Sequence, residues 1–186
     1  MSFGGVNSFQ QYTNDLGIGN NGVKITFNYF DGLPDPNLLN ALRSNNLKLI
    51  FKSLTKRDDI TKEKALTELI SSITKENVEN GIFDDIFLLC WSQIYSKLIT
   101  NESKTIRSQS HLITITLIKM LNKKINKFLK DFIPLYLLGT CDTDLYVGKN
   151  CTRELLECFN KDQKKIDTLW IAFYEQILNL CKQVIV

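Results

Sequence analysis

The 186-residue sequence contains one histidine and three prolines, and none of its cysteines are paired at C-x-x-C spacing. The five cysteines are odd in number and lie mostly in apolar runs, which is typical of reduced thiols in the cytosol or nucleus. Without short cysteine pairing, a structural zinc site at Cys141, Cys151 and Cys158 is disfavoured. No apolar run reaches the ~18 residues of a membrane span, and residues 1–5 lack the basic region of a signal peptide.

Catalytic constellations are also missing. The lone histidine, His111, has no fixed cysteine or aspartate partner in the sequence, and we expect a surface or half-buried structural role for it. Residues 17–22 match G-x-G-x-x-G, but a β-like segment at 23–30 follows them, so no helix N-terminus is available to hold a pyrophosphate. We therefore expect no cofactor, no metal and no catalytic residue in this segment.

Acidic residues are absent between residues 104 and 130. This stretch carries seven basic side chains, Lys104, Arg107, Lys119, Lys123, Lys124, Lys127 and Lys130. Elsewhere 16 basic residues face 20 acidic ones, so the rest of the chain sums to −4 although the whole is +3. Such a block attracts polyanions or acidic partners over about 8–10 Å. Its plainer interpretation is a solvated helix face that keeps the domain soluble.

The geometry of this block depends on whether the helix continues. If residues 117–132 formed one helix, four of the lysines would span about 80° of its surface. If the chain turns near 122–126, the lysines crowd one corner between two helices. A second basic set, Lys56, Arg57, Lys62 and Lys64, is interleaved with acidic residues and is more simply a solvated turn. There, Asp59 or Thr61 is expected to cap the following helix.

The apolar spacing predicts an all-α fold. We expect helices at residues 36–43, 46–55, 61–75, 84–99, 104–122, 125–138, 152–159 and 163–185. Short connections between helices of this length favour antiparallel pairs stacked side by side. The apolar–proline–apolar pattern at 128–135 is common in the first helix of HEAT repeats. We therefore expect a HEAT/ARM-like helical domain over 34–186, preceded by an irregular glycine-rich arm over 1–33. Because residues 184–186 end an apolar helix without a polar cap, we expect the start of a much longer solenoid.

Residues 54–69 carry a recognisable motif. They read L-T-K-R-D-D-I-T-K-E-K-A-L-T-E-L, which resembles the L-x-K-R-D-x-x-T-K-x-K-A-L-x-x-L opening of the first helical repeat in listerin. Listerins are large RING-type ubiquitin-protein ligases of ribosome-associated quality control. Residues 3–10, 87–95 and 138–144 also resemble listerin segments in the expected order, most closely those of fungal members.

The resemblance implies the N-terminal domain of a listerin. In that family this region docks on the large ribosomal subunit that carries a stalled peptidyl-tRNA, beside the quality-control factor that recognises the obstructed subunit. A distant C-terminal RING domain transfers ubiquitin from a conjugating enzyme to the nascent chain. The resemblance thus implies a ribosome-associated protein of the cytosol, with a nuclear location as an alternative, and no membrane partner. It implies zinc only in the RING domain, which this chain lacks.

We therefore expect a segment that binds and positions but does not catalyse. Ribosomal RNA is the polyanion that a basic, acid-free block suits. The candidate contact residues are Lys56, Arg57, Lys62, Lys64, Arg107, Lys119, Lys123, Lys124, Lys127 and Lys130. Charge alone favours the 104–130 block, whereas the resemblance favours the 56–64 turn. The alternative function is a helical adaptor whose lysines hold an acidic protein segment without RNA.

Overall fold

The computed structural model describes residues 34–185, with side chains described through residue 183. The arm expected over 1–33, with its glycine turn at 17–22 and extended segment at 23–30, lies outside the described residues. Within them, none of the helices is both long and apolar enough to cross a lipid bilayer.

Helices account for most of the described chain, and no strand occurs in it. The elements are α2 (Pro36–Ala41), α3 (Asn45–Leu54), α4 (Asp59–Ser72), α5 (Lys75–Glu79), α6 (Asp85–Ile99), α7 (Lys104–Leu121), the 3-10 helix η1 (Asn122–Phe128), α8 (Leu129–Thr140), α9 (Leu145–Cys158), α10 (Gln163–Ala172) and α11 (Tyr174–Ile185). The expected all-α class is confirmed.

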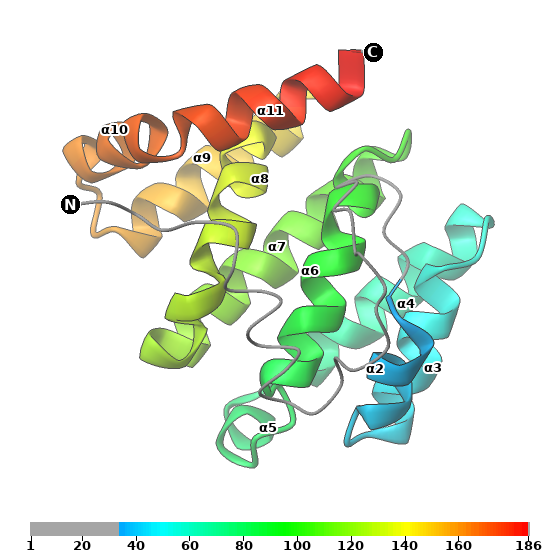
Figure 1. The fold of residues 1–186 in the computed structure, drawn as a ribbon. Coiled ribbons are helices and arrows are strands. Elements are labelled where there is room, and N and C mark those ends of the chain that lie inside the picture. The colour runs from blue at the N-terminus through cyan, green and yellow to red at the C-terminus, as the bar shows by residue number, and fades with distance from the viewer. Residues whose placement is uncertain (1–33, 186) are drawn as a thin grey trace, which may run out of the picture.

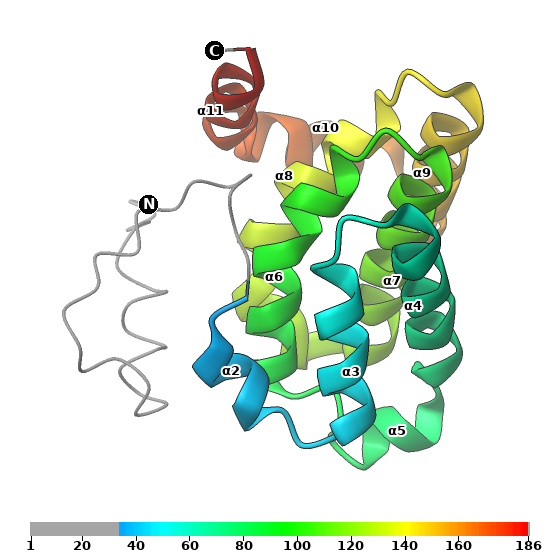
Figure 2. The ribbon, with the colours of Figure 1, turned by 90° about the vertical axis from the view of Figure 1, so that its right-hand side faces the viewer.

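Consecutive helices pack in pairs, and the pairs stack in chain order. The pairs are α3 with α4, α6 with α7, and α8 with α9. Helices α4 and α9 both pack against α7, and α6 packs against α8. Figure 2 shows α4, α7 and α9 as one layer and α6 and α8 as the other. The described chain is therefore a solenoid-like stack, and its assignment to the HEAT type stays a prediction.

The apolar faces of these helices form two continuous cores. The larger joins α2 through α8 and includes Leu180 of α11. Some of its aromatic rings meet edge to face, as in the Phe51–Phe87 pair at 5.7 Å and the Phe83–Phe87 pair at 4.8 Å. The smaller joins α7 through α11 around Ile133 and Leu137. Most of these helices thus bury an apolar stripe against their neighbours, as their three- and four-residue apolar spacing predicts, whereas the short α5 has no buried residue.

Polar contacts lie buried inside the larger core. The indole nitrogen of Trp91 donates to the hydroxyl of Thr114 at 2.9 Å, and the hydroxyl of Tyr95 lies 2.7 Å from Nδ1 of His111. His111 is only 2% exposed, so the expected surface or half-buried position is wrong. Burial lowers the pKa of His111 to about 4, which keeps the ring neutral at physiological pH.

Several helix boundaries differ from the expected ones. Helix α9 begins at Leu145 rather than 152, because Asp144 accepts hydrogen bonds from the backbone N–H groups of Tyr146 and Val147. The short helix α5 was not expected. The helix expected over 163–185 is interrupted at Phe173, between α10 and α11, where the apolar periodicity runs on without a break.

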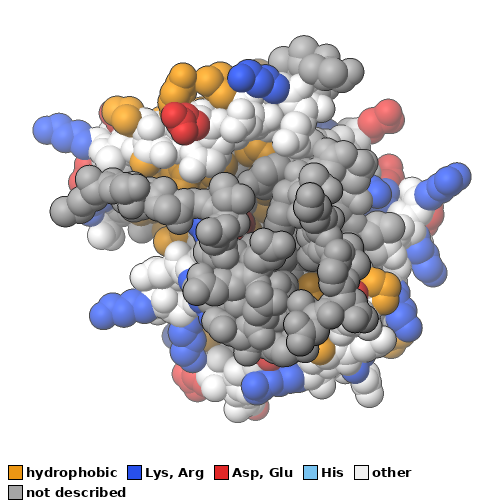
Figure 3. All heavy atoms as spheres, in the orientation of Figure 1, with side chains coloured by type: hydrophobic (Ala, Val, Ile, Leu, Met, Phe, Trp, Pro, Cys, Tyr) orange, Lys and Arg blue, Asp and Glu red, His pale blue; other side chains and the backbone are white. Residues whose placement is uncertain are grey.

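Helices α10 and α11 leave apolar side chains uncovered. Ile171, Tyr174 and Leu178 are exposed there, and Figure 3 shows hydrophobic side chains along the top of the molecule, where Figure 1 places these two helices. Among the cysteines of the described helices, Cys90 is buried, whereas Cys158 and Cys181 are half-buried.

Candidate functional site

The 56–64 turn joins α3 to α4 and is held by its own side chains. Asp58, rather than the expected Asp59 or Thr61, caps α4, and its carboxylate accepts from the backbone N–H of Thr61 at 2.8 Å. Lys62 donates from Nζ to Oδ1 of Asp59 at 2.8 Å and to the carbonyl of Arg57 at 3.3 Å. Because its side chain is only 13% exposed, Lys62 is an internal contact of the turn rather than a free charge.

The neighbouring loop between α6 and α7 binds this turn from the side. The Nδ2 of Asn101 donates to Oδ1 of Asp59 at 3.1 Å, and the hydroxyl of Ser103 donates to Oε1 of Glu63 at 2.8 Å. The hydrogen bonds from Lys62 and Asn101 lower the pKa of Asp59, so the carboxylate stays charged and keeps its partners. The two loops are therefore fixed relative to each other.

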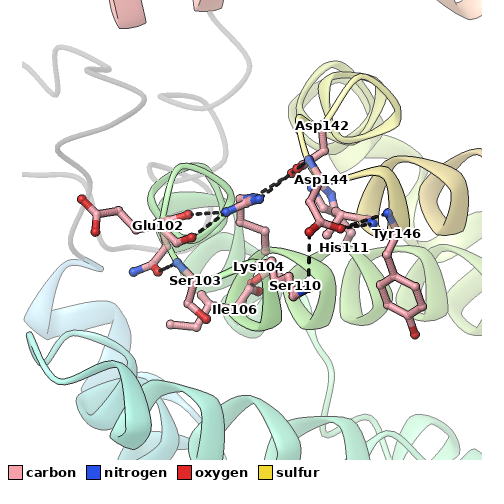
Figure 4. Close-up of polar contacts among 12 residues, drawn as sticks. Glu102, Ser103, Lys104, Ile106, Ser110, His111, Asp142, Asp144 and Tyr146 are labelled. Carbon is pink, nitrogen blue, oxygen red and sulfur yellow. Dashed lines mark hydrogen bonds and ion pairs between the residues drawn. The ribbon is translucent and has the colours of Figure 1, made fainter.

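Arg107, in the first turns of α7, extends this bracing to a third loop. Its Nε and Nη2 donate to Oδ2 and Oδ1 of Asp142 at 2.7 and 2.9 Å. Its Nη1 donates to the carbonyls of Asn101 and Glu102, each at 2.9 Å. Figure 4 shows Glu102 and Ser103 on one side of this contact and Asp142 and Asp144 on the other. One guanidinium thus joins the α6–α7 loop to the α8–α9 loop.

Arg107 and Asp142 each stabilise the charged form of the other. Burial alone would raise the pKa of Asp142, but the Arg107 guanidinium and the N–H of Asp144 outweigh it, and the net pKa is lowered. The hydrogen bonds to Asp142 raise the pKa of Arg107. Side-chain exposures of 13% for Arg107 and 7% for Asp142 leave little room for an external ligand. Direct contact of Arg107 with a partner stays a prediction, although Nε, Nη1 and Nη2 are each hydrogen-bonded within the chain.

These three loops form one surface, which we call the braced edge: residues 55–64, 100–104 and 141–146. Its exposed basic side chains are Lys56, Arg57, Lys64 and Lys104, the last with Nζ 3.4 Å from Asp144. Large apolar side chains lie beside them, since Leu145 is 74% exposed and Tyr146 is 67% exposed. The N-termini of α4, α7 and α9 all meet at this edge.

The remaining lysines of the 104–130 block lie at the opposite end of α7. This helix has 18 residues, so the block is divided over about 27 Å. Asn122, with φ of 48°, ends α7, so the continuous helix over 117–132 is wrong and the turned alternative is confirmed. We call this second region, residues 119–130, the lysine corner. On the face shown in Figure 3, Lys and Arg side chains lie scattered around the outline rather than in one patch.

Internal ion pairs use part of the charge of the lysine corner. Lys119 lies 2.7 Å from Glu154, and Lys127 pairs with Asp85. Lys123 and Lys124 are exposed and make no ion pair with any described residue. The block that looked like a single positive surface is thus two regions, each partly neutralised.

Sequence reasoning missed several members of the braced edge, among them Asn101, Ser103, Asp142, Leu145 and Tyr146. The family-like segment 138–144 was the one available signal, since it contains Asp142. Across residues 34–185, no group of three or more His, Cys, Asp or Glu side chains is arranged to hold a metal ion. Along the braced edge, exposed basic side chains thus lie beside exposed apolar ones.

Comparison with known proteins shows which family the chain belongs to. The model of the family described as E3 ubiquitin-protein ligase listerin, N-terminal domain, matches residues 42–186. The chain belongs to the listerin family. It is 64% identical over all 186 residues to the E3 ubiquitin-protein ligase listerin of Saccharomyces cerevisiae, and 31% identical over 135 residues, 73% of the chain, to that of Neurospora crassa. The resemblance to fungal listerins seen in the 54–69 motif is thereby confirmed.

The chain spans a small part of these listerins. It covers 12% of the length of the Saccharomyces cerevisiae protein and 8% of the Neurospora crassa protein. The similarity extends to animals, with 31% identity over 108 residues to the listerin of Drosophila melanogaster, which covers 58% of the chain and 6% of that protein. The family membership thus concerns the N-terminal domain.

Proposed function

We propose that this segment docks a listerin-type ubiquitin ligase on the large ribosomal subunit, and that the braced edge is the docking surface. The observation that carries the proposal is the fixed arrangement of three loops around Arg107 and Asp142. A preformed surface loses little conformational entropy on binding. Three exposed cations on it, Lys56, Arg57 and Lys64, make no ion pair with a described residue and suit a phosphate backbone.

The braced edge is favoured over the lysine corner for this role. Both were candidates on sequence grounds, but Lys119 and Lys127 form ion pairs with acidic residues of the chain. The exposed Leu145 and Tyr146 give the braced edge an apolar component as well. A surface that combines cations with an exposed aromatic ring suits a composite partner of ribosomal RNA and protein, the protein being a ribosomal protein or the factor that recognises stalled subunits.

The catalytic step belongs elsewhere in this proposal. Relatives named E3 ubiquitin-protein ligase are many times longer than the chain. In the proposed division of labour, this domain positions the ligase in the cytosol, and a RING domain with its own zinc recruits the conjugating enzyme and transfers ubiquitin to the stalled nascent chain. The helical domain, which we propose is of the HEAT type, supplies orientation.

A charge-reversal experiment tests the docking surface. Lys56, Arg57 and Lys64 are changed together to glutamate, and binding to purified large subunits that carry peptidyl-tRNA is measured as a function of salt. Each lost phosphate contact should reduce the slope of log affinity against log salt by about 0.7–0.9. Changes of the two lysines to arginine should be tolerated, because a phosphate contact asks mainly for charge.

A second triple variant is the matched control. Reversal of Lys75, Lys123 and Lys124 changes the net charge equally but lies away from the braced edge. Its affinity should stay close to that of the unmodified chain. The proposal fails if the control variant loses binding while the braced-edge variant keeps it, because the lysine corner would then carry the docking.

A further inference from the structure

A groove of about 630 Å³ lies at the lysine corner, on the edge opposite the braced edge. The end of α7, η1, the start of α8 and the end of α9 form its walls. Its volume falls within the range of pockets that hold a ligand or a few residues of a peptide. The proposed docking on the ribosome makes no use of this groove.

The floor of the groove is apolar. Ile125 is fully buried below it, and Ile118, Leu129 and Phe159 are half-buried with part of their surface facing the groove. Three of these four side chains are aliphatic. Base stacking requires aromatic faces, so this floor suits apolar side chains of a protein better than the bases of an RNA.

Two asparagines on the rim carry side-chain amides without partners in the described chain. Asn122 and Asn126 both line the groove, and both are exposed. Asn122 has the left-handed backbone that ends α7, and η1 then carries Asn126 along the same rim. A primary amide offers both donors and an acceptor, so it can pair with the N–H and C=O of a peptide unit. An extended chain could thus be held by its backbone while alternate side chains enter the floor.

The charge of the rim selects among such peptides. Lys119 and Glu154 neutralise each other at 2.7 Å, and Glu157 lies 3.9 Å from Lys161. Lys123 on the rim is exposed and makes no ion pair with a described residue, so its charge is uncompensated. The groove therefore carries a positive surplus above an apolar floor.

We propose that this groove binds a short extended segment of a partner protein in which acidic residues alternate with apolar ones. The apolar side chains enter the floor between Ile118 and Leu129, the backbone pairs with the amides of Asn122 and Asn126, and the acidic side chains face Lys123. The segment thus gives the domain a second contact, independent of the braced edge.

The probe is a short fluorescent peptide in which leucine alternates with glutamate, titrated with the chain and followed by anisotropy and by amide chemical shifts. Binding should saturate and shift the amide signals of Ile118, Ile125 and Leu129. The Lys123→Glu variant should bind about tenfold more weakly, and Asn126→Ala should also lose affinity. A peptide with lysine in place of glutamate should not saturate the groove.

The matched control is Lys64→Glu, an equal charge reversal on the braced edge. It should leave peptide affinity unchanged, whereas Lys123→Glu should leave binding to large subunits unchanged, so the two proposals fail separately. The groove proposal is overturned if the alternating peptide does not bind saturably, or if Lys123→Glu binds it as well as the unmodified chain. Displacement of the peptide from Ile118 and Leu129 by polyuridine would also overturn it, since the groove would then be an RNA site.

Discussion

Arg107 of α7 and Asp142 of the α8–α9 loop meet in a two-point ion pair, with N–O distances of 2.7 and 2.9 Å. The residues are 35 positions apart in sequence, and the same guanidinium also binds two carbonyls of the α6–α7 loop. A planar guanidinium can satisfy a carboxylate and two carbonyls at once, which a lysine ammonium cannot do in this geometry. The pair therefore sets the relative position of two loops that carry the proposed docking surface.

Replacement of Arg107 by alanine should destabilise the domain by roughly 2–4 kcal/mol, a little below the cost of breaking a fully buried pair because this one lies at a loop edge. Chemical denaturation measures the effect. Arg107→Lys should recover only part of the loss, since one ammonium cannot reproduce both bonds. Equal stability of the three proteins would show that the pair contributes nothing.

The pH dependence of this effect has a definite sign. The pKa of Asp142 is lowered in the folded chain, so the stability that the pair contributes is complete above the ordinary carboxyl pKa of 3.8. It is lost as the pH falls below that value and the folded carboxylate takes up a proton. The difference between the unmodified chain and Arg107→Ala should therefore be constant near neutral pH and shrink below about pH 4.

The buried His111 and the half-buried Asp131 should give opposite pH dependences of stability that offset each other. Burial lowers the pKa of His111 to about 4, so acid favours the unfolded chain, which protonates near 6.5. Burial raises the pKa of Asp131 to about 6, so acid favours the folded chain, which protonates before the unfolded chain does at 3.8. Between pH 6 and 4 the two contributions have opposite signs.

Single variants should separate these contributions. His111→Gln should become more stable on going from pH 6 to 4, relative to its own value at neutral pH, whereas Asp131→Asn should become less stable. The unmodified chain should lie between them with a nearly flat profile. Urea denaturation at several pH values measures all three, and parallel profiles would contradict the assignment of the two pKa values.

A close contact makes Gly139 intolerant of a side chain. A Cβ placed on Gly139 would lie 2.5 and 2.9 Å from Nε2 and Nδ1 of His111. Gly139→Ala should therefore cost about 1–3 kcal/mol through overpacking, measured by denaturation. The cost should fall in a His111→Ala background, because the two side chains compete for one space. Gly148→Ala is the control and should cost less, since the nearest atoms to its Cβ would be the carbonyl oxygens of Thr140 and Asp142, at 3.2 and 3.5 Å.

The fold could be predicted from the sequence further than the site could. Apolar spacing predicted the helical class and the approximate place of most helices, because most of them bury one apolar stripe. It did not reveal the start of α9, because Leu145 and Tyr146 face solvent there and break the apolar pattern. The same spacing predicted one helix over 163–185 in place of α10 and α11, because the apolar pattern continues through Phe173.

The candidate site depends on contacts between residues that are far apart in the sequence, and the sequence alone does not show which residues pair. A count of charges placed Arg107 with the lysines of the 104–130 block, whereas its partner Asp142 lies in another loop. The same count treated Lys119 and Lys127 as free, although Glu154 and Asp85 approach them from other helices. The sequence therefore shows where the basic residues are, but the ion pairs formed in the fold decide which of them remain available to a partner.

The cysteines should differ sharply in reactivity. Cys141 is exposed in the α8–α9 loop, whereas Cys90 and Cys151 are buried, and burial raises the pKa of each of these two to about 12. A thiol reacts as its thiolate, so Cys141 should be alkylated first at neutral pH and the two buried thiols only after unfolding. Mass spectrometry of the chain during timed alkylation measures the order.

Cys158 should react at an intermediate rate, because it is half-buried and burial raises its pKa less. Early labelling of Cys90 would show that the α6 core opens under native conditions, and the packing described around Trp91 and Tyr95 would then be wrong.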